Sequence, residues 1–483
     1  MSYNDDIQQN NIELAEILDA VNSLSGGDAS ITNATVRSVE VKEGEFVEAG
    51  EFVQIRREGA TVPTFDDVLT FSVAKAAICA LTETKIVAFH AATESSMYNV
   101  YATVIEKLNG AWTEGTPTLI KSVAKDSYAT YVPIVAVKVS DSIVILDTSQ
   151  KGSGNDYKHE VVAVSVDAYN VITAGQPKAI STGSSSRYWV VLDGVLEYAG
   201  EYNALFHCAI SNSTSIAATT RSGHGLVGIT VDPASLALTV GTVYRFIAEV
   251  SSDVANICPY ANAIHISDNK LLVAAAYKDG NEIRFEMRVA IVAVNAGTVA
   301  ILSTKTLTGA TTSNTALSDT DMPCLFKIDN SNFMMLQNKF CWKIVLSDDT
   351  ISTLTAITNA SVAPTLTKHP TLKKQVDETT TLYLWNSSSY MRAQLFHVVD
   401  IDTPVDADDY VTVTDTDGNA TGNVALATSI GQKILFLTDN LYLNEADAVT
   451  TDYAYPYFDR IDGLAKTAGS GGDTIEVYVP EVV

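Results

Sequence analysis

The side chains that could do chemistry are scattered along this chain and form no familiar catalytic group. Five cysteines occur without a CxxC pair or a short metal-ligand spacing, at Cys79, Cys208, Cys258, Cys324 and Cys341. Most of them have apolar neighbours, which favours buried free thiols and folding inside a reducing cell. The seven histidines are dispersed, and those in strand-like segments, His90, His207 and His265, are typical of hydrogen-bonded core or wall positions. The sequence therefore predicts no metal centre and no cofactor.

Motifs that carry catalysis are also absent from the sequence. There is no Gly-x-Ser-x-Gly elbow, no HExxH segment and no glycine loop that would hold a phosphate. The marks of sialidase-like, WD and kelch propellers do not occur either. Acidic residues are numerous, but no spacing singles out a pair suited to glycoside hydrolysis. We therefore expect a non-enzymatic protein with no catalytic residues.

One acidic stretch deserves a metal hypothesis of its own. Asp415, Asp417 and Asn419 alternate around Gly418 in a pattern that resembles a calcium-binding turn, because Ca²⁺ binds several close oxygen atoms. The pattern lacks the closing glutamate and the flanking helices of an EF-hand. Solvated acidic hairpins are the favoured interpretation, and a calcium site is the alternative.

The elements that must position these residues are short β-strands in a repeat. Threonine, valine and tyrosine recur throughout, and apolar residues alternate with polar ones. An apolar strand recurs about every 60 residues, at Lys85–Phe89, Ser142–Leu146, Asn203–His207, Lys270–Ala274, Asn332–Leu336, Thr380–Leu384 and Lys433–Leu437. Turn residues follow in the same phase, at Asn109-Gly110, Asp167-Ala168, Asp232-Pro233, Asn295–Gly297 and Asp348-Asp349.

One apolar strand, a variable loop and a hairpin make up the blade of a β-propeller. The repeat therefore predicts a mainly β chain with a six- or seven-bladed propeller over residues 61–440, each apolar strand being the inner strand of a blade. A long β-solenoid is the alternative, although its repeats would be shorter and more regular.

Aromatic residues give the one indication of a binding face. Several residues before a predicted inner strand come Tyr128 and Tyr131, then Tyr188 and Trp189, and then Tyr260. Loops that lead into the inner strands of a propeller lie on one face, where these rings could stack on sugars or anchor a protein partner. The alternative is that they fill the wedges between blades.

Residues 1–25 carry the one sustained helical pattern. Two heptad positions are occupied by Ile7, Leu14 and Val21 and by Asn10, Ile17 and Leu24, which predicts a short coiled coil whose Asn10 fixes the register. Because a helix this short is marginal in water, its apolar stripe needs a partner. We expect self-association through Ile7, Leu14, Ile17, Val21 and Leu24. Packing against the chain's own domain is the alternative.

The charge balance narrows the possible partners. The chain carries 57 acidic and 31 basic residues, for a net charge of −26, which argues against a general nucleic-acid binder. No apolar run approaches the length of a membrane span, so membrane insertion is not expected. The first ten residues are polar and acidic, unlike a signal peptide, which predicts release from the cell by lysis.

Three segments together resemble virion proteins of phages that infect Gram-positive hosts. The opening Met1–Ile7 with its coiled coil looks like a particle-attachment segment, and Ile266–Tyr277 resembles propeller repeats of phage fibres. The ending Ile461–Val479 is similar to C-terminal segments of phage tail and head-surface proteins. Val39–Val53 is similar to glycine-turn strands of small barrels on phage heads.

This resemblance implies a domain order and a role. The segments 26–60 and 441–483 would fold together as a small β module, with the propeller inserted between them. The chain would be a structural protein of the virion, made in the host cytoplasm and released by lysis. As a tail or baseplate fibre it would form a homotrimer, contact other virion proteins and bind a bacterial surface glycan. A head fibre or capsid decoration protein is one alternative, and a propeller enzyme that degrades cell-wall polysaccharide is another.

Overall fold

The computed structural model describes the chain as two compact units. The described residues are 31–124, 135–148, 150–151, 157–158, 160–180, 195–211, 221–247, 261–278, 284–311, 323–337, 340–357, 372–387, 390–421, 424–439, 441–456 and 463–482. One unit comprises Met1–Thr61, Val376–Glu378 and Val449–Val483, and the other comprises Val62–Gln375 and Thr379–Ala448. The described residues contain strands and turns without a helix, so none of them could form a membrane-spanning helix. The predicted coiled coil lies outside the described residues and stays a prediction.

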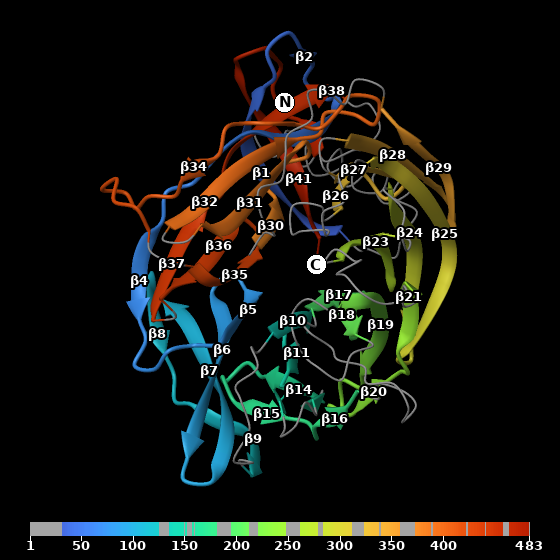
Figure 1. Ribbon diagram of the computed structural model, residues 1–483. Helices are drawn as coiled ribbons and strands as arrows, with labels where there is room; N and C mark the ends of the chain where they lie inside the picture. Colours follow the sequence, from blue (N-terminus) through green and yellow to red (C-terminus); the bar gives the residue numbers. More distant parts are fainter. Residues whose placement is uncertain are drawn as a thin grey trace. The chain divides into compact units, whose positions relative to one another are not determined.

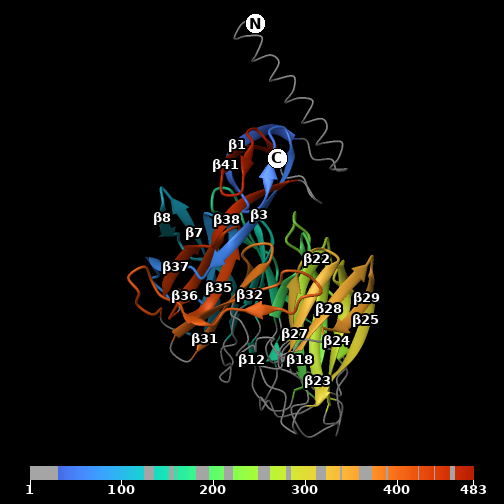
Figure 2. The ribbon, with the colours of Figure 1, turned by 90° about the horizontal axis from the view of Figure 1, so that it is seen from above.

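The first unit is a closed five-stranded barrel built from both ends of the chain. Its strands follow the order β1 (Ile31–Val41), β38 (Val449–Pro456), β3 (Phe52–Thr61), β39 (Gly463–Ala465) and β41 (Thr474–Val482). Strand β1 runs antiparallel to β41, with Thr35 opposite Val479. Figure 2 shows the blue N-terminal strands β1 and β3 beside the red C-terminal strands β38 and β41. Strands from both predicted terminal segments, 26–60 and 441–483, pair in this barrel, but residues 441–448 of the second segment belong to the propeller.

Alternating apolar residues close the barrel on a core of its own. The side chains that point inward are small and mostly β-branched: Val39, Val41, Val47, Val53, Ala454, Ala465, Ile475 and Val477. Gly44 and Gly50 have φ angles of +90° and +84°, which only glycine adopts without strain, so the motif of glycine turns is a requirement of the backbone. A short ribbon of β2 (Phe46–Val47) and β40 (Gly469–Ser470) extends from the barrel strands.

The second unit is a seven-bladed β-propeller. Figure 1 shows its seven sheets arranged around a central axis, with the first strand of each sheet innermost. Blade 1 contains β5 (Ala77–Thr82), β6 (Lys85–Glu94), β7 (Met97–Leu108), β8 (Ala111–Glu114) and β9 (Thr118–Ala124). Blade 2 contains β10 (Val135–Ser140), β11 (Ile143–Asp147), β14 (Glu160–Val166), β15 (Ile172–Ala174) and β16 (Lys178–Ala179). Between β11 and β14, β12 (Gln150–Lys151) pairs with β13 (Tyr157–Lys158).

The next three blades repeat this meander. Blade 3 contains β17 (Val195–Tyr198), β18 (Asn203–Ser211), β19 (Arg221–Val231), β20 (Leu238–Val240) and β21 (Tyr244–Ile247). Blade 4 contains β22 (Asn262–Ser267), β23 (Lys270–Lys278), β24 (Arg284–Asn295) and β25 (Thr298–Thr311). Blade 5 contains β26 (Cys324–Lys327), β27 (Asn332–Gln337), β28 (Phe340–Ser347) and β29 (Thr350–Ala356).

The last two blades complete the ring. Blade 6 contains β30 (Leu372–Gln375), β31 (Thr380–Ser387), β32 (Tyr390–His397) and two short outer strands, β33 (Asp406–Ala407) and β34 (Val411–Thr412). Blade 7 contains β35 (Val424–Ile430), β36 (Lys433–Thr438), β37 (Tyr442–Asp447) and β4 (Asp66–Thr70). Since β4 comes from the start of the propeller and its three partners from the end, blade 7 joins the two ends of the ring.

The seven apolar strands of the repeat are real, but they occupy a different place from the one predicted. They are the second strands of the blades, from β6 to β36, and a further strand lies inside each of them. A second strand is paired on both edges and covered on both faces, so it reads as a continuous apolar run. The inner strands carry lysines and other polar residues among the apolar ones, so their pattern is weaker. The prediction of these segments as inner strands was therefore wrong by one strand.

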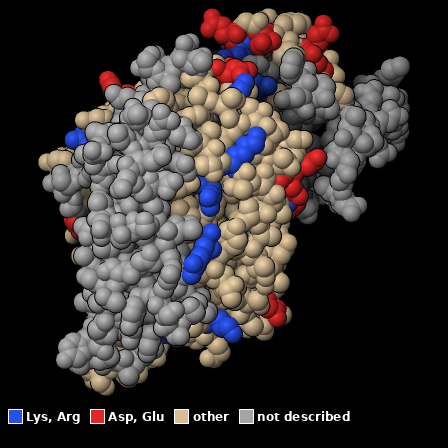
Figure 3. Space-filling view, turned by 45° about the vertical axis from the view of Figure 1, so that its right-hand side comes forward, with Lys and Arg blue, Asp and Glu red and all other residues tan. Residues whose placement is uncertain are grey.

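The predicted hairpin turns join the third and fourth strands of their blades. Asn109, Ala296 and Asp348 have positive φ angles, as the turn residues required. Figure 3 shows the side of the propeller that carries blades 4 and 5, where a few basic side chains form a row and acidic side chains lie toward the edges of the view. Strand β25 has Lys305 as its one charged residue and β29 has none, so the outer surface of these blades is rich in threonine.

Candidate functional site

The inner strands of the propeller surround two adjoining cavities. One has a volume of about 810 Å³ and is lined by blades 1, 2, 3, 6 and 7. The other has a volume of about 520 Å³ and is lined by blades 3, 4, 5 and 6. Both are lined by Glu197, Tyr198 and Leu372, so the two cavities adjoin each other, and together they are called the channel. All seven blades line this channel, and blades 2 to 7 contribute polar side chains to it.

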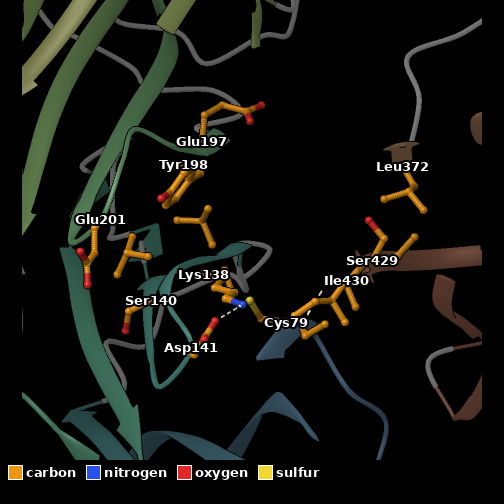
Figure 4. Close-up of a pocket in the computed structure, with 16 residues that line it drawn as sticks. Cys79, Lys138, Ser140, Asp141, Glu197, Tyr198, Glu201, Leu372, Ser429 and Ile430 are labelled. Atoms are coloured by element: carbon orange, nitrogen blue, oxygen red, sulfur yellow. Dashed lines mark hydrogen bonds and ion pairs between the residues drawn. The ribbon is translucent and has the colours of Figure 1, made fainter. Parts of the chain in front are cut away.

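The larger cavity has an acidic wall on blades 2 and 3. Figure 4 shows Glu197, Tyr198 and Glu201 on one side of it, Ser429 and Ile430 on the other, and Asp141 beside Lys138 near Cys79. Asp141 lies 2.6 Å from the Lys138 ammonium, which leaves Glu197 and Glu201 as acids that this lysine does not neutralise. Burial, with the charges of Glu201 and Asp141, raises the pKa of the Tyr198 phenol, so it stays protonated and can donate a hydrogen bond.

The smaller cavity contains two histidines and an exposed aromatic ring. Tyr198 of blade 3 packs on His265 of blade 4, with 4.9 Å between ring centroids. The His265 ring is held in place because its Nε2 lies 2.8 Å from the carbonyl oxygen of Asp268. His207, on β18, is 3 % exposed, and its Nε2 lies 3.9 Å from the Glu197 carboxylate. That separation is too long for a hydrogen bond.

Three inner-strand lysines each donate a hydrogen bond to the blade before their own. Lys138 of blade 2 donates to the Leu81 carbonyl at 2.7 Å, and Lys327 of blade 5 donates to the Ile266 carbonyl at 2.8 Å. Lys373 of blade 6 donates to the carbonyl of Leu325 in blade 5. Burial lowers the pKa of Lys327 and of Lys373. These ammonium groups tie neighbouring blades together and place positive charge on the blade 5 and blade 6 side of the channel.

The four described cysteines of the propeller are buried thiols with raised pKa values. Cys79, Cys208, Cys324 and Cys341 are buried free thiols, as predicted for the cysteines as a group, and Cys258 lies outside the described residues. Burial raises the pKa of Cys79 and of Cys208 to about 12, and it raises the pKa of Cys324 and Cys341 as well. Since the thiolate is the reactive form, these side chains serve as small apolar groups at neutral pH.

The five aromatic residues predicted to bind a ligand lie outside the described residues: Tyr128, Tyr131, Tyr188, Trp189 and Tyr260. Their place in the chain is still informative. They fall between β9 and β10, between β16 and β17, and between β21 and β22. Each of the strands that follow, β10, β17 and β22, is the inner strand of a blade. The residues stay candidates.

The predicted calcium candidates form a compact turn. Asp415 accepts hydrogen bonds from the backbone amide of Asn419 at 2.7 Å and from its side chain at 3.0 Å. These hydrogen bonds lower the pKa of Asp415. The Asp415 carboxylate is therefore already satisfied by the turn itself. Within the described ranges, no three His, Cys, Asp or Glu side chains gather in a way that could hold a metal ion.

Sequence reasoning placed one of three residues that line the smaller cavity, His207, and missed the other two, Glu197 and Lys373. His207 was expected to be a wall histidine, and the structure places it in the wall of the smaller cavity. Glu197 and Lys373 were not singled out, since each lies in a short inner strand with no distinctive motif. They share one feature: each is a charged residue in a short strand that comes just before an apolar strand. This feature identifies them only when the short strand is known to be the inner strand of a blade.

No family model and no curated protein matches the chain. Several solved propeller structures are similar to it. The CNH domain of AfRom2 is 11 % identical, covering 79 % of this chain and 99 % of that one, with a TM-score of 0.36. The WD40 domain of SCAP from fission yeast is 8 % identical, covering 89 % and 99 %, with a TM-score of 0.33. A family 117 glycoside hydrolase of the marine bacterium Zobellia galactanivorans is 11 % identical, covering 57 % and 76 %, with a TM-score of 0.24. Because identity and TM-score are both low, no functional argument rests on these likenesses.

Proposed function

We propose that this chain is a non-enzymatic structural and binding protein of a phage-like particle, a tail or baseplate fibre that attaches the particle to a bacterial surface. The observation that carries this proposal is the construction of the barrel. Thr61, at the end of β3, pairs with Val449, at the start of β38. The chain thus leaves the barrel for the propeller and returns to it at neighbouring positions in one sheet. The propeller is a large module inserted into a small one, which suits a binding domain carried on an anchor.

The proposed binding face is the end of the propeller at which the inner strands begin. In the sequence, Tyr128 and Tyr131, Tyr188 and Trp189, and Tyr260 each precede an inner strand, β10, β17 and β22, that begins at this end. A flat aromatic ring covers the C–H face of a sugar and leaves its hydroxyl groups free for hydrogen bonds. Single contacts of this kind are weak, and several copies on one oligomer would multiply them into avidity.

The residues of the channel support a binder over an enzyme. Lys138, Lys327 and Lys373 already donate hydrogen bonds to backbone carbonyls of neighbouring blades. The buried thiols have raised pKa values. The lysines and the thiols therefore have structural roles, in joining blades and in filling the core, that explain why they are present. The competing function is a propeller that degrades cell-wall polysaccharide.

Incubation of the full chain with purified Gram-positive cell walls separates the two functions. We expect the protein to sediment with the walls and the supernatant to gain no reducing sugar over a protein-free control. Sustained release of reducing sugar would replace the binder with a hydrolase. Absence of sedimentation with walls from every host tested would contradict attachment.

The position on the particle needs imaging of intact phage. Gold-labelled antibody against the propeller should mark the tail tip or baseplate of particles that contain this chain. Label distributed over the capsid would instead assign the chain to head fibres or decoration proteins, the alternative role.

Self-association is proposed through the N-terminal heptads. Removing residues 1–25 should lower the mass measured by light scattering from that of a trimer to that of a monomer, because Ile7, Leu14, Ile17, Val21 and Leu24 would supply the interface. An unchanged mass would show that the interface lies elsewhere.

A further inference from the structure

His207 is an unusual group for a propeller wall. Its ring is 3 % exposed and lines the smaller cavity, and its Nε2 has no hydrogen-bond partner among the described residues. A buried polar atom without a partner costs about 1–3 kcal/mol, so folded proteins retain few of them. The nearest acid, Glu197, approaches the ring nitrogen to 3.9 Å only. The imidazole and the carboxylate therefore face the same space without bonding to each other.

A cationic wall lies on the other side of this space. Lys373 and Lys327 line the same cavity from blades 6 and 5, together with Gln375 and Thr381. Burial lowers the pKa of Lys373, and the negative charge of Glu197 on blade 3 is close enough to oppose that shift. Each ammonium uses part of its donor capacity on a backbone carbonyl, and an ammonium has three N–H groups to donate. The cavity thus holds a carboxylate and an imidazole on blade 3 and a wall of ammonium donors on blades 5 and 6.

A hydroxyl group can form hydrogen bonds with both walls, because it is a donor and an acceptor at once. A hydroxyl donates to a carboxylate or an imidazole and accepts from an ammonium, whereas a simple anion or cation satisfies one wall alone. Tyr198, which is 38 % exposed and packed on His265, adds an aromatic surface at the border of the two cavities. The cavity volumes of about 520 and 810 Å³ lie within the range of about 300–1,000 Å³ that small-molecule sites occupy.

We propose that the channel of this propeller is a binding site for a small saccharide, held between Glu197 and His207 on one side and Lys373 on the other, with a sugar face against Tyr198. The site is distinct from the aromatic face of the proposed attachment function and rests on none of its residues. A zwitterion such as an amino acid is the rival ligand, since it would place its ammonium on Glu197 and its carboxylate on Lys373.

Calorimetric titration of the full chain tests this site. The probes are D-glucose, D-galactose, N-acetyl-D-glucosamine and, for the rival ligand, glycine. At least one sugar should bind saturably with one site per chain, and glycine should give no saturable heat. Glu197→Gln should weaken the binding of that sugar about tenfold, because one charge-assisted hydrogen bond is lost. Lys373→Met should weaken it by a similar factor.

The matched control is Asp349→Asn, which removes one acidic charge from an exposed ion pair with Lys270. It should leave the sugar affinity unchanged. The proposal is overturned if no sugar binds saturably, if glycine binds in place of the sugars, or if Glu197→Gln binds as tightly as the unaltered chain.

The cell-wall assay keeps this proposal separate from the attachment function. Wall binding without saccharide binding would remove the channel site and leave the attachment role. Saccharide binding without wall binding would keep the channel site and contradict the attachment role.

Discussion

Two junctions between neighbouring blades both contain an apolar core, and they differ in what accompanies it: an aromatic cluster in one and a nearly buried carboxylate in the other. Between blades 5 and 6, Phe326 packs on Tyr383 and Phe396 with ring centroids 5.7 and 5.6 Å apart, and all three rings are at most 1 % exposed. Between blades 7 and 1, the Glu445 carboxylate accepts hydrogen bonds from Lys107 at 2.7 and 2.8 Å and from the Trp112 indole at 2.5 Å.

This difference follows from how the ring is made. The strands of blades 5 and 6 follow one another in the chain, and their aromatic packing accompanies the hydrogen bond that Lys373 donates to the Leu325 carbonyl. Blade 7 must join blade 1 across the whole length of the propeller, and it takes β4 from the start of the chain. Directional hydrogen bonds fix one register at such a junction better than apolar contact does. We infer that the Glu445 carboxylate adds a pH-dependent contribution to the stability of the closing junction, whereas the contribution of the Phe326 ring to the inner junction does not depend on pH.

The largest expected effect comes from the apolar junction. Phe326→Ala should lower the free energy of unfolding of the propeller by about 4 kcal/mol, because it removes a fully buried ring and leaves a cavity. The measurement is the urea midpoint of the propeller transition. The matched control is Phe46→Ala at a ring that is 54 % exposed, with an expected loss below about 0.5 kcal/mol. A loss below about 1 kcal/mol for Phe326→Ala would show that the aromatic cluster does not hold the junction.

A smaller loss is expected at the closing junction. Glu445→Ala should cost about 2 kcal/mol, since it leaves Lys107 and the Trp112 indole without their acceptor in a site that water partly reaches. Lys433 keeps a second acid, Asp447, at 2.8 Å. Asp349→Asn, at an exposed pair, is the control and should change stability by less than about 0.5 kcal/mol. Equal losses at Glu445 and Asp349 would end the idea of an ionic closure.

The smallest and most specific effect is a pH dependence. Burial raises the pKa of Glu445, but hydrogen bonds from Lys107, Trp112 and Lys433 outweigh it and hold the pKa below its usual 4.5. A lowered pKa in the folded state means that the stabilisation is present above pH 4.5 and is lost as the pH falls through the folded value. The stability gap between the unaltered chain and Glu445→Gln should therefore shrink between about pH 7 and about pH 3.5. The gap for Phe326→Ala should stay constant, and shrinkage of both gaps alike would contradict the contrast between the junctions.

Much of the architecture could be predicted from local sequence. Apolar strands such as Lys85–Phe89 are visible because a second strand is buried on both faces. Hairpin turns such as Asn109-Gly110 are visible because few residues adopt positive φ. The glycine turns of the barrel, Gly44 and Gly50, belong to the same class of signal.

The features that could not be predicted depend on contacts between residues far apart in the sequence. The strand β4 contains Asp66 and Asp67 and looks like a polar linker, and it becomes a strand because β37 offers a free edge. The channel site combines Glu197, His207 and Lys373 from blades 3 and 6, and only closure of the ring brings them together. No spacing between these three residues in the sequence predicts that they lie in one cavity.

The central claim, attachment through the aromatic face, is tested most directly by Tyr188→Ala combined with Trp189→Ala in the full chain. The bound fraction in the cell-wall assay and the melting temperature are measured on the same preparations. Our account predicts that wall binding is lost while the melting temperature stays within about 1 °C of the unaltered chain, because surface substitutions have small effects on stability. Wall binding that persists, or a large fall in melting temperature that shows these rings to be wedge fillers, would contradict it.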